Sequence, residues 1–205
     1  MRLILVRHGE TSWNRLGRFQ GQGQVGLNDL GYRQACRAAG ALRSVKPAAL
    51  YSSPLPRALM TAEEISRELS LPVVPLDGMK EIALGDLEGI TSKTMRAQYS
   101  QLYTAWRHAP SSVTFPGGES LEQLQDRAWS AFEYIGKTHP DDIVVAVSHG
   151  FAIGTILCRF MGLPLSQFHS LSVDLGSMSI IQTNSRSHRV VAINDRCHLD
   201  GDGPG

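Results

Sequence analysis

The chain has 205 residues, of which 42% are hydrophobic and 19% are charged. This composition excludes a fibrous or disordered protein, and a chain of this length buries roughly 70% of its unfolded surface on folding. With 20 basic and 19 acidic residues the formal net charge is +1, so no overall positive field attracts a nucleic acid or a membrane surface. Any anion that the protein binds must be held by a local cluster of cations.

Three widely spaced cysteines, Cys36, Cys158 and Cys197, form no CxxC pair and no zinc-site spacing with histidine. They are interpreted as reduced, mostly buried thiols, which favours a cytoplasmic location. The apolar start of the chain, Leu3 to Val6, is too short for the core of a signal peptide and is expected to belong to the fold.

Short apolar runs alternate with segments of helical periodicity in the first part of the chain. The run at 3–6 is typical of a strand buried on both faces. After Asn28, the candidate cap, a helix is predicted whose apolar stripe runs from Leu30 to Val45, and a weaker strand is predicted at 48–51. The next helix is expected to begin near Leu55, with Pro56 in its first turn.

The same alternation continues in the second part. The clearest helix begins at Ser120, where Gln123 completes a capping box. A second strongly apolar strand is predicted at 143–147, followed by a helix from Gly150 to about Met161. Two closing strands are expected at 172–183 and 190–193, joined by a polar turn around Asn184 and Ser185.

Strands that alternate with helices predict an α/β fold, a three-layer αβα sandwich with a mostly parallel mixed sheet. The chain has no linker and no internal repeat, so a single domain over 1–199 is the simplest organisation. The tail, 200–205, is expected to be flexible.

Two of the apolar strands end in the same way, with a histidine followed by a glycine. His8 and Gly9 follow the strand at 3–6, and His149 and Gly150 follow the strand at 143–147. In open α/β sheets, ligands bind at the carboxyl edge of the strands. The two histidines are therefore expected to converge there.

Two arginines are predicted at the same edge. Arg57 lies in the first turn of the helix that follows the strand predicted at 48–51, and Arg7 precedes His8. Guanidinium groups bind phosphate oxygens with two donors, and the positive end of a helix also favours an anion. The cluster is therefore a candidate receptor for a tetrahedral dianion, with phosphate the natural ligand.

Each feature alone has a simpler explanation. A histidine after a strand is more often a structural residue than a catalyst, and Arg7 alone could form a surface ion pair. The convergence of His8, His149, Arg7 and Arg57 at one edge is what favours a functional site.

The motifs of this chain resemble those of the histidine phosphatase superfamily, also called phosphoglycerate mutase-like. The first is Leu5-Val6-Arg7-His8-Gly9-Glu10-Thr11, followed by Asn14. The others follow in the expected order over nearly the whole chain: Gln20-Gly21, Leu27 with Gly31, Gln34 and Ala35, Ser52-Ser53-Pro54-Leu55-x-Arg57-Ala58 with Thr61-Ala62, Glu81-x-x-x-Gly85-x-Leu87-Glu88-Gly89, Pro116-Gly117-Gly118-Glu119-Ser120, and Val147-Ser148-His149-Gly150.

The resemblance implies roles for individual residues, and it implies neither a cofactor nor a metal. It implies that His8 is the nucleophile, that Glu81 is the general acid and base, that Arg7, Asn14, Arg57 and His149 bind phosphate, and that Gln20 and Gly21 border the substrate. Chemical logic agrees, because attack requires a neutral imidazole and an unperturbed histidine has a pKa of about 6.5. His149 and the arginines would stabilise the charge of the transferring phosphoryl group.

Two details of the motifs leave alternatives open. Asp86 and Glu88 lie near Glu81 in sequence and are rival acids, although motif position favours Glu81. The loop at 20–27 departs from the family pattern, which more often has Asp and Pro between Gln-Gly and Leu, and this puts its contacts in doubt.

The same core residues serve phosphatases and mutases. In this family the segment between the acid and the second histidine, about 81–118 here, covers the pocket, and mutases carry a longer and more basic version. The short stretch 91–115, the run at 116–120 and the ending Asn194-Asp195-x-x-His198-Leu199 resemble the phosphatase branch. A phosphatase for small-molecule phosphate monoesters is therefore predicted, with phosphoglycerate mutase as the alternative.

Two further alternatives come from other classes of function. A metallohydrolase could use His8, His149 and a carboxylate as ligands, although Arg7 and Arg57 would repel the metal. A non-catalytic phospholigand-binding domain would keep the arginines and tolerate the loss of Glu81.

The sequence does not identify the ester. Broad-specificity, α-ribazole-phosphate, phosphoserine and sugar-phosphate phosphatases are all candidates, and monomer and homodimer both remain open. In the covering segment, Tyr99, Tyr103 and Trp106 are as readily explained by packing as by substrate contact. Arg107 and His108 could bind a second acidic group of the substrate.

Overall fold

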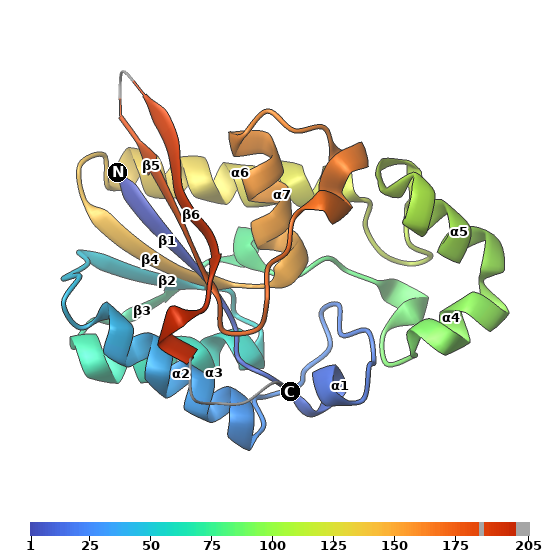
Figure 1. The fold of residues 1–205 in the computed structure, drawn as a ribbon, viewed down its shortest axis with the longest axis horizontal. Helices are drawn as coiled ribbons and strands as arrows, with labels where there is room; N and C mark the ends of the chain where they lie inside the picture. Colours follow the sequence, from blue (N-terminus) through green and yellow to red (C-terminus); the bar gives the residue numbers. More distant parts are fainter. Residues whose placement is uncertain (185–186, 200–205) are drawn as a thin grey trace.

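The computed structural model describes residues 1–184 and 187–199. They form a six-stranded mixed sheet in the order β3-β2-β4-β1-β5-β6 (Figure 1). Its strands are β1 (Arg2–Arg7), β2 (Ala49–Ser52), β3 (Val73–Pro75), β4 (Ile143–Ser148), β5 (Met178–Thr183) and β6 (His188–Asp195). The first four are parallel to one another, whereas β5 and β6 extend the sheet in antiparallel pairing beyond β1.

The two strongly apolar strands lie side by side in the middle of the sheet. The side chains of β1 alternate between its two faces, as the pleat requires. Leu3 and Leu5 join a core cluster on one face, while Ile4 and Val6 join a cluster on the other. Because both faces are covered, these strands contain unbroken apolar runs, as the sequence predicted.

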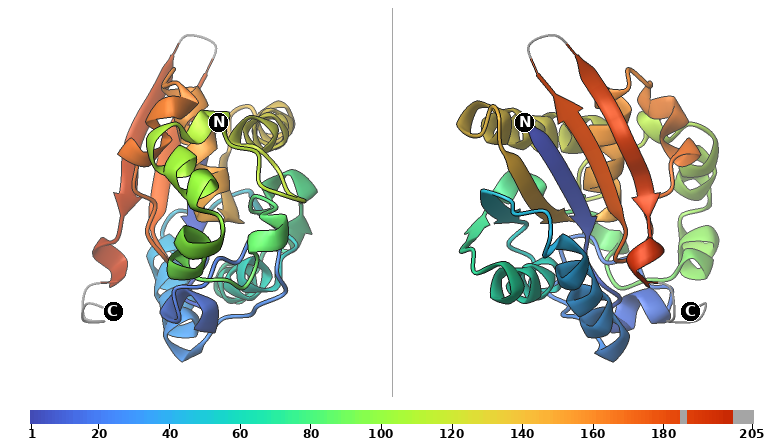
Figure 2. Two further views of the ribbon diagram at one scale, coloured as in Figure 1. Left: turned by 90° about the vertical axis from the view of Figure 1, so that its right-hand side faces the viewer. Right: turned by 60° about the vertical axis from the view of Figure 1, so that its left-hand side comes forward.

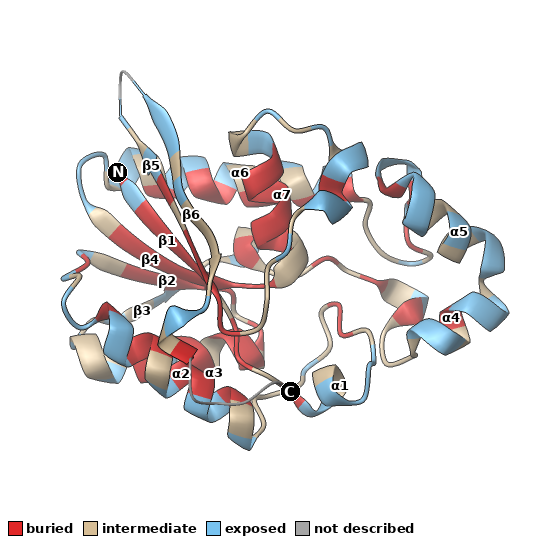
Figure 3. Ribbon diagram, viewed as in Figure 1, coloured by how far each residue is buried: buried red, intermediate tan, exposed pale blue. Residues whose placement is uncertain are grey.

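Two pairs of helices cover the sheet. Helices α2 (Asp29–Leu42) and α3 (Pro56–Leu69) pack on the face of Ile4 and Val6, and α6 (Leu121–Thr138) and α7 (Gly150–Phe160) pack on the other. Figure 2 shows the sheet between these layers, and Figure 3 shows that the buried residues lie on the strands and the inner helix faces. The predicted αβα sandwich is confirmed.

The predicted helix starts are confirmed by their caps. Asn28 Oδ1 accepts from the Gly31 N–H at 2.9 Å, and Pro56 is the first residue of α3. At the start of α6, the Ser120 hydroxyl accepts from the Gln123 N–H, and the Gln123 side chain accepts from the Ser120 N–H. These contacts satisfy N–H groups that lack a partner inside the helix.

The covering segment contains two helices that the periodicity did not indicate, α4 (Ser92–Gln98) and α5 (Ser100–His108). They lie away from the sheet (Figure 1) and are mostly exposed (Figure 3). A third core cluster, which includes Met95 and Phe115, packs beneath them. The remaining short elements are α1 (Ser12–Arg15), η1 (Asp77–Met79), η2 (Gly85–Leu87), η3 (Pro110–Ser112), η4 (Leu165–Ser170) and η5 (Cys197–Leu199).

Several boundaries differ from the prediction. Strand β5 begins at Met178 rather than at 172, because the preceding residues form a loop that turns at Gly176, where φ is +70°. Strand β3 was not predicted. Helix α2 ends at Leu42, before Val45.

The prediction of mostly buried thiols is wrong for two of the three cysteines. Cys158 is buried, but Cys36 and Cys197 are exposed, because Cys36 lies on the outer side of α2 and Cys197 lies at the start of η5.

Two predicted features reach beyond the described residues: the turn at Ser185 and the tail at 200–205. Within 1–184 and 187–199, no helix is both long enough and apolar enough to cross a bilayer.

The capping box of α6 gives a prediction for stability. Ser120→Ala removes the acceptor for the Gln123 N–H and should lower the free energy of unfolding by about 1 kcal/mol, a fall of roughly 2–4 °C in melting temperature for a chain of this size. The measurement is thermal unfolding followed by circular dichroism. Ser130→Ala is the matched control, because the Ser130 hydroxyl donates to the Asp126 carbonyl within the same helix; an equal loss in both variants would contradict the prediction.

Candidate active site

The two histidines meet at the carboxyl edge of the parallel strands. Arg7, the last residue of β1, pairs with Ser148, the last residue of β4, so the following residues emerge side by side. The rings of His8 and His149 are 5.1 Å apart between centroids and inclined by 58°. Gly9 allows the chain to turn closely here, since a Cβ on it would lie 2.3 Å from the Gly31 carbonyl oxygen. The predicted convergence is confirmed.

The His8 ring is held in one tautomer. Its Nδ1 lies 2.7 Å from the Gly9 carbonyl oxygen, which can only accept, so Nδ1 carries the proton. Nε2 therefore presents a lone pair, and Arg57 Nε donates to it at 3.2 Å. Burial, followed by the charges of Arg57 and Arg7, holds the pKa of His8 well below 6.5. Near pH 7 the ring is a neutral base with its lone pair on Nε2.

The Arg57 side chain is fully buried and is held by main-chain oxygens. Its Nη2 donates to the Gly21 carbonyl at 2.7 Å and its Nη1 to the Gly23 carbonyl at 3.0 Å. Burial lowers the pKa of Arg57 to about 10, so the group stays charged at neutral pH. The unusual loop at 20–27 thus does contact the site, through its backbone.

Arg7 is also held by a carbonyl rather than by a carboxylate. Its Nη1 donates to the Val173 carbonyl oxygen at 2.5 Å. Burial lowers the pKa of Arg7, although the charges of Glu81 and Asp174 oppose this shift. Among the described residues, neither Arg7 nor Arg57 forms an ion pair with a carboxylate, so their positive charge is available to an anion.

Two buried polar atoms at this edge have no partner. Among the described residues, the buried side-chain atoms without a hydrogen bond are Arg7 Nε, His149 Nδ1 and Ser177 Oγ. Two of these three belong to the site. Buried polar groups are otherwise nearly always satisfied, so Arg7 Nε and His149 Nδ1 are the atoms expected to meet a ligand.

The surroundings of His149 indicate which of its nitrogens carries the proton. Ser53 Oγ accepts from the Leu55 N–H and lies 2.7 Å from His149 Nε2. A Ser53 hydroxyl that donates to Nε2 leaves the proton on Nδ1, ready to donate to an anion. Burial, then the charges of Arg57 and His8, keep the pKa of His149 well below 6.5.

Asn14 and Gln20 are tied to Thr11. Asn14 Oδ1 accepts from the Thr11 N–H at 3.1 Å, which leaves its Nδ2 as the donor that a ligand can use. The Thr11 hydroxyl lies within hydrogen-bond distance of both Asn14 Oδ1 and Gln20 Oε1. These contacts hold the chain after His8 against the loop that carries Gly21.

Glu81 lies at the N-terminus of α7. Its Oε2 accepts from the Phe151 N–H at 3.2 Å, and its Oε1 accepts from the N–H groups of Ala152 at 3.2 Å and Ile82 at 3.0 Å. The rival acids are placed differently. Glu88 Oε1 accepts from the Gln22 N–H and braces the loop, and Asp86 is exposed.

A cavity of about 130 Å³ lies at this edge. It is lined by seven of the eight predicted site residues: Arg7, His8, Asn14, Gln20, Gly21, Arg57 and Glu81. The eighth, His149, contacts the ring of His8 instead. The prediction missed the remaining lining residues, Arg18, Phe19, Ile82, Leu84 and Phe151.

The missed residues lack a recognisable chemical signature. Arg18 is exposed at the rim, where its Nη1 donates to the Gly89 carbonyl at 2.7 Å, and it could have been found only as a further cation near the Gln20-Gly21 motif. The aromatic residues Phe19 and Phe151 look like core residues in the sequence. Ser53 was part of a quoted motif, but its contact with His149 was not predicted.

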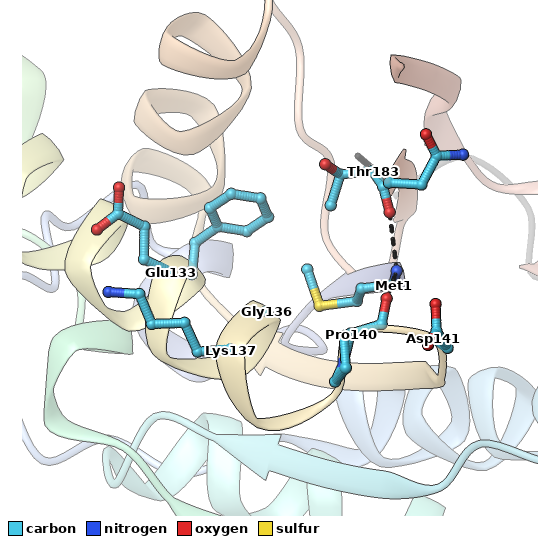
Figure 4. A pocket seen from close by; sticks show the side chains of 9 residues that line it. Met1, Glu133, Gly136, Lys137, Pro140, Asp141 and Thr183 are labelled. Atoms are coloured by element: carbon cyan, nitrogen blue, oxygen red, sulfur yellow. Dashed lines mark hydrogen bonds between the residues drawn. The ribbon is translucent and has the colours of Figure 1, made fainter. Parts of the chain in front are cut away.

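A larger cavity, of about 500 Å³, lies elsewhere. It borders Met1 at the opposite end of β1 (Figure 4), where the Met1 amine donates to the Thr183 carbonyl at 2.8 Å. No histidine or arginine lines it, so it offers neither an imidazole nucleophile nor a guanidinium group for phosphate. The smaller cavity at His8 therefore has the chemistry that the larger one lacks.

The Asn-Asp-x-x-His-Leu motif near the end of the chain binds the loop that contacts Arg7 and His8. Asn194, with φ at +56°, accepts from the Asp174 N–H and donates to its carboxylate. His198 Nε2 donates to the Gly176 carbonyl at 3.0 Å, and the Gly176 N–H donates to the His8 carbonyl at 3.1 Å. The loop that also binds Arg7 is thus held at Asp174 and at Gly176.

A family model described as the histidine phosphatase superfamily, branch 1, matches residues 3–196. The chain belongs to this superfamily. Its named relatives include phosphoserine phosphatase 1 of Hydrogenobacter thermophilus, which is 35% identical over 199 residues, 97% of this chain and 94% of that protein. The metal-independent phosphoserine phosphatase of Arabidopsis thaliana is 39% identical over 160 residues, 77% of this chain and 67% of that protein.

Solved structures of histidine phosphatases share the fold. YhfR of Bacillus stearothermophilus matches with a TM-score of 0.93 and 32% identity, over 97% of this chain and 99% of that one. The family, the α/β fold and the class of phosphoric monoester hydrolase predicted from the sequence are therefore confirmed.

The lowered pKa values of His8 and His149 in this histidine phosphatase give a prediction for how its stability depends on pH. In the folded protein His8 and His149 stay neutral, whereas in the unfolded chain they take up protons below pH 6.5. The unfolded state then binds more protons, so the free energy of unfolding should fall between pH 6.5 and 5, by up to about 1 kcal/mol per pH unit for each histidine.

Urea unfolding in phosphate-free buffer measures this slope. His8→Asn should reduce it, and His108→Asn, which changes an exposed histidine, should leave it unchanged. The same slope in all three proteins would show that His8 does not have a depressed pKa.

Proposed function

We propose that this histidine phosphatase hydrolyses small phosphate monoesters without a metal, through a phosphohistidine on His8. The observation that carries the proposal is the neutral His8 ring with its Nε2 lone pair directed at Arg57. The ring lies beside two guanidinium groups that have no carboxylate partner in the part of the chain that the structure describes. A phosphate monoester dianion supplies the missing negative charge and an electrophilic phosphorus at that lone pair.

In the first step of the proposed mechanism, the Nε–H of Arg57 shifts from His8 to a substrate oxygen, and His8 Nε2 attacks phosphorus. The N–P bond forms as the bond to the leaving oxygen breaks. Glu81, in its acid form, protonates that oxygen, so that an alcohol departs. Arg7, Arg57 and the Nδ1–H of His149 stabilise the charge on the equatorial oxygens.

In the second step, water takes the place of the alcohol. The Glu81 carboxylate accepts a proton from this water as its oxygen attacks phosphorus and the N–P bond breaks. Inorganic phosphate leaves, His8 is again neutral, and Glu81 again carries the proton needed for the next cycle.

The alternatives have weaker support. For the metallohydrolase, no group of three or more His, Cys, Asp or Glu residues within 1–184 and 187–199 is arranged to hold a metal ion. A non-catalytic binding domain would not need a nucleophile with a fixed tautomer and an acid in the same cavity. Phosphoglycerate mutase remains the alternative that uses the same core residues, since chemistry at His8 is common to both reactions.

The shape of the site favours a small ester with an apolar portion. A volume of about 130 Å³ is below the range of pockets for drug-sized ligands, roughly 300–1,000 Å³. Phe19 and Phe151 line both this cavity and an apolar space that reaches Trp106. Phe19 and Trp106 also line a cleft of about 400 Å³ that includes Arg107. Because the apolar space measures only about 10 Å³, the alcohol portion of a larger ester is expected to pass Phe19 directly into the cleft that includes Arg107.

The relatives named as phosphoserine phosphatases make phosphoserine the first ester to test. The proposed setting is the cytoplasm, with the protein as a monomer or a homodimer. The net charge of +1 supports neither a nucleic acid nor a membrane as partner.

The experiment that tests the proposal is a panel of phosphate monoesters assayed in the presence of a chelator. Phosphate release should persist, His8→Ala should reduce it by at least about 1,000-fold, and rapid acid-free quenching should trap one phosphoryl group on His8. Restoration of activity only by zinc or manganese would contradict the metal-independent mechanism. Interconversion of 3-phosphoglycerate and 2-phosphoglycerate faster than any phosphate release would favour the mutase.

A separate prediction concerns the second acidic group of the substrate. Arg107 lines the cleft with Trp106, whereas neither His108 nor Tyr99 does. Arg107→Ala should raise KM several-fold for esters that carry a carboxylate, such as phosphoserine, and leave KM unchanged for neutral alkyl phosphates. His108→Ala on the same helix is the control. An unchanged KM for every acidic ester would exclude this role of Arg107.

A further inference from the structure

The segment that carries Glu81 has no regular structure of its own. Glu81 lies between η1, which ends at Met79, and η2, which begins at Gly85. A general acid must be held within a fraction of an ångström of the leaving oxygen. The groups that hold this segment therefore matter for the proton transfer.

One guanidinium group holds the main chain just before and at Glu81. Arg127, on α6, donates from Nη1 to the carbonyls of Lys80 at 2.7 Å and Gly78 at 3.1 Å. Its Nη2 donates to the Glu81 carbonyl at 2.7 Å. The side chain thus binds three carbonyls of one irregular segment.

The remaining donors of Arg127 bind one carboxylate. Nε donates to Glu119 Oε1 at 2.7 Å, and Nη2 donates to Glu119 Oε2 at 2.8 Å. A guanidinium group has five N–H donors, and these five contacts use all of them. Lysine has three donors in a different geometry and cannot reproduce the arrangement.

Glu119, the carboxylate partner of Arg127, binds the main chain on the other side of Glu81. Its Oε2 accepts from the Ala83 N–H at 2.8 Å, and its own N–H donates to the Ala83 carbonyl at 2.8 Å. Burial raises the pKa of Glu119, but the hydrogen bonds from Arg127 and Ala83 outweigh this effect and hold the pKa below 4.5. The close approach requires Gly118, on which a Cβ would lie 2.2 Å from the Ala83 carbonyl oxygen.

We propose that Arg127 and Glu119 are positioning residues for Glu81. Together they fix the main chain on both sides of the acid, at residues 80, 81 and 83, and thereby aim its carboxyl group at the cavity. This inference rests on the proposed role of Glu81. Both side chains are about three-quarters buried, 24% and 22% exposed, so water does not replace their contacts readily.

The acid step can be isolated by its dependence on the leaving group. The kcat/KM value reports steps up to departure of the alcohol, so it excludes hydrolysis of the phosphoenzyme. An alkyl ester such as phosphoserine needs protonation of its leaving oxygen, whereas p-nitrophenyl phosphate releases a stable anion. Loss of a general acid should therefore reduce kcat/KM for the alkyl ester far more than for the aryl ester.

Three variants test the inference: Arg127→Lys, Glu119→Gln and Glu81→Gln. Glu81→Gln should lower kcat/KM for the alkyl ester by about 100-fold relative to the aryl ester. Arg127→Lys and Glu119→Gln should each give a selective loss of about 10-fold. Asp126→Asn is the matched control, because it breaks another ion pair on the same helix, to Arg159 at 2.9 Å, and should change neither ester.

The double variant Glu81→Gln/Arg127→Lys separates positioning from general damage. It should show the same alkyl-to-aryl ratio as Glu81→Gln alone, since no acid remains to be aimed. A further selective loss, or an equal loss on both esters in Arg127→Lys and Glu119→Gln, would overturn the inference. If thermal unfolding shows that Arg127→Lys or Glu119→Gln is not folded, the other of these two variants provides the test.

Different results would reject the acid role of Glu81 and the positioning role of Arg127 and Glu119. A Glu81→Gln variant without a selective loss on the alkyl ester would remove the proposed acid, and the positioning inference with it. A selective loss in Glu81→Gln without one in Arg127→Lys or Glu119→Gln would leave the acid in place and reject the positioning role alone.

Discussion

The pairing of β1 with β4 determines where the chemistry of this protein lies. Arg7 lies opposite Ser148 in a parallel ladder, so His8 and His149 leave the sheet at the same level. A slip of one residue would turn every buried side chain of β1 to the wrong face, and the fold therefore fixes this register strongly. The separation of the two imidazoles is a property of the sheet, and the arginines and Glu81 are arranged around it.

Burial accounts for two features of the proposed active site together, the neutral imidazoles and the strong positive field of the guanidinium groups. The same desolvation that keeps the His8 ring neutral also leaves the charge of Arg57 poorly screened. Burying a guanidinium group is costly, and here carbonyl oxygens offset part of that cost without neutralising the charge. A carboxylate in their place would have satisfied Arg57 and removed its attraction for phosphate.

The sequence predicted those features that depend on local patterns. The apolar runs of β1 and β4, the histidines after them and the cap at Ser120 each have a signature within a few residues. Strand β3 was missed because it has three residues and prolines at its borders, as edge strands often do. The role proposed for Arg127 has no local signature, because the three carbonyls that it binds near Glu81 lie more than 45 residues away in the chain.

The way in which Arg57 is held has a consequence for how this enzyme can change. Its anchors are the carbonyls of Gly21 and Gly23, atoms that every amino acid possesses. An exposed side chain of the same loop, such as Gln24, can therefore be exchanged while the backbone and the guanidinium keep their positions. Gln22 is less free to change, because its Nε2 donates to the Glu81 carbonyl at 3.2 Å. The placement of the Arg57 guanidinium is in this sense separable from the identity of the outer side chains on the loop, which can vary without displacing it.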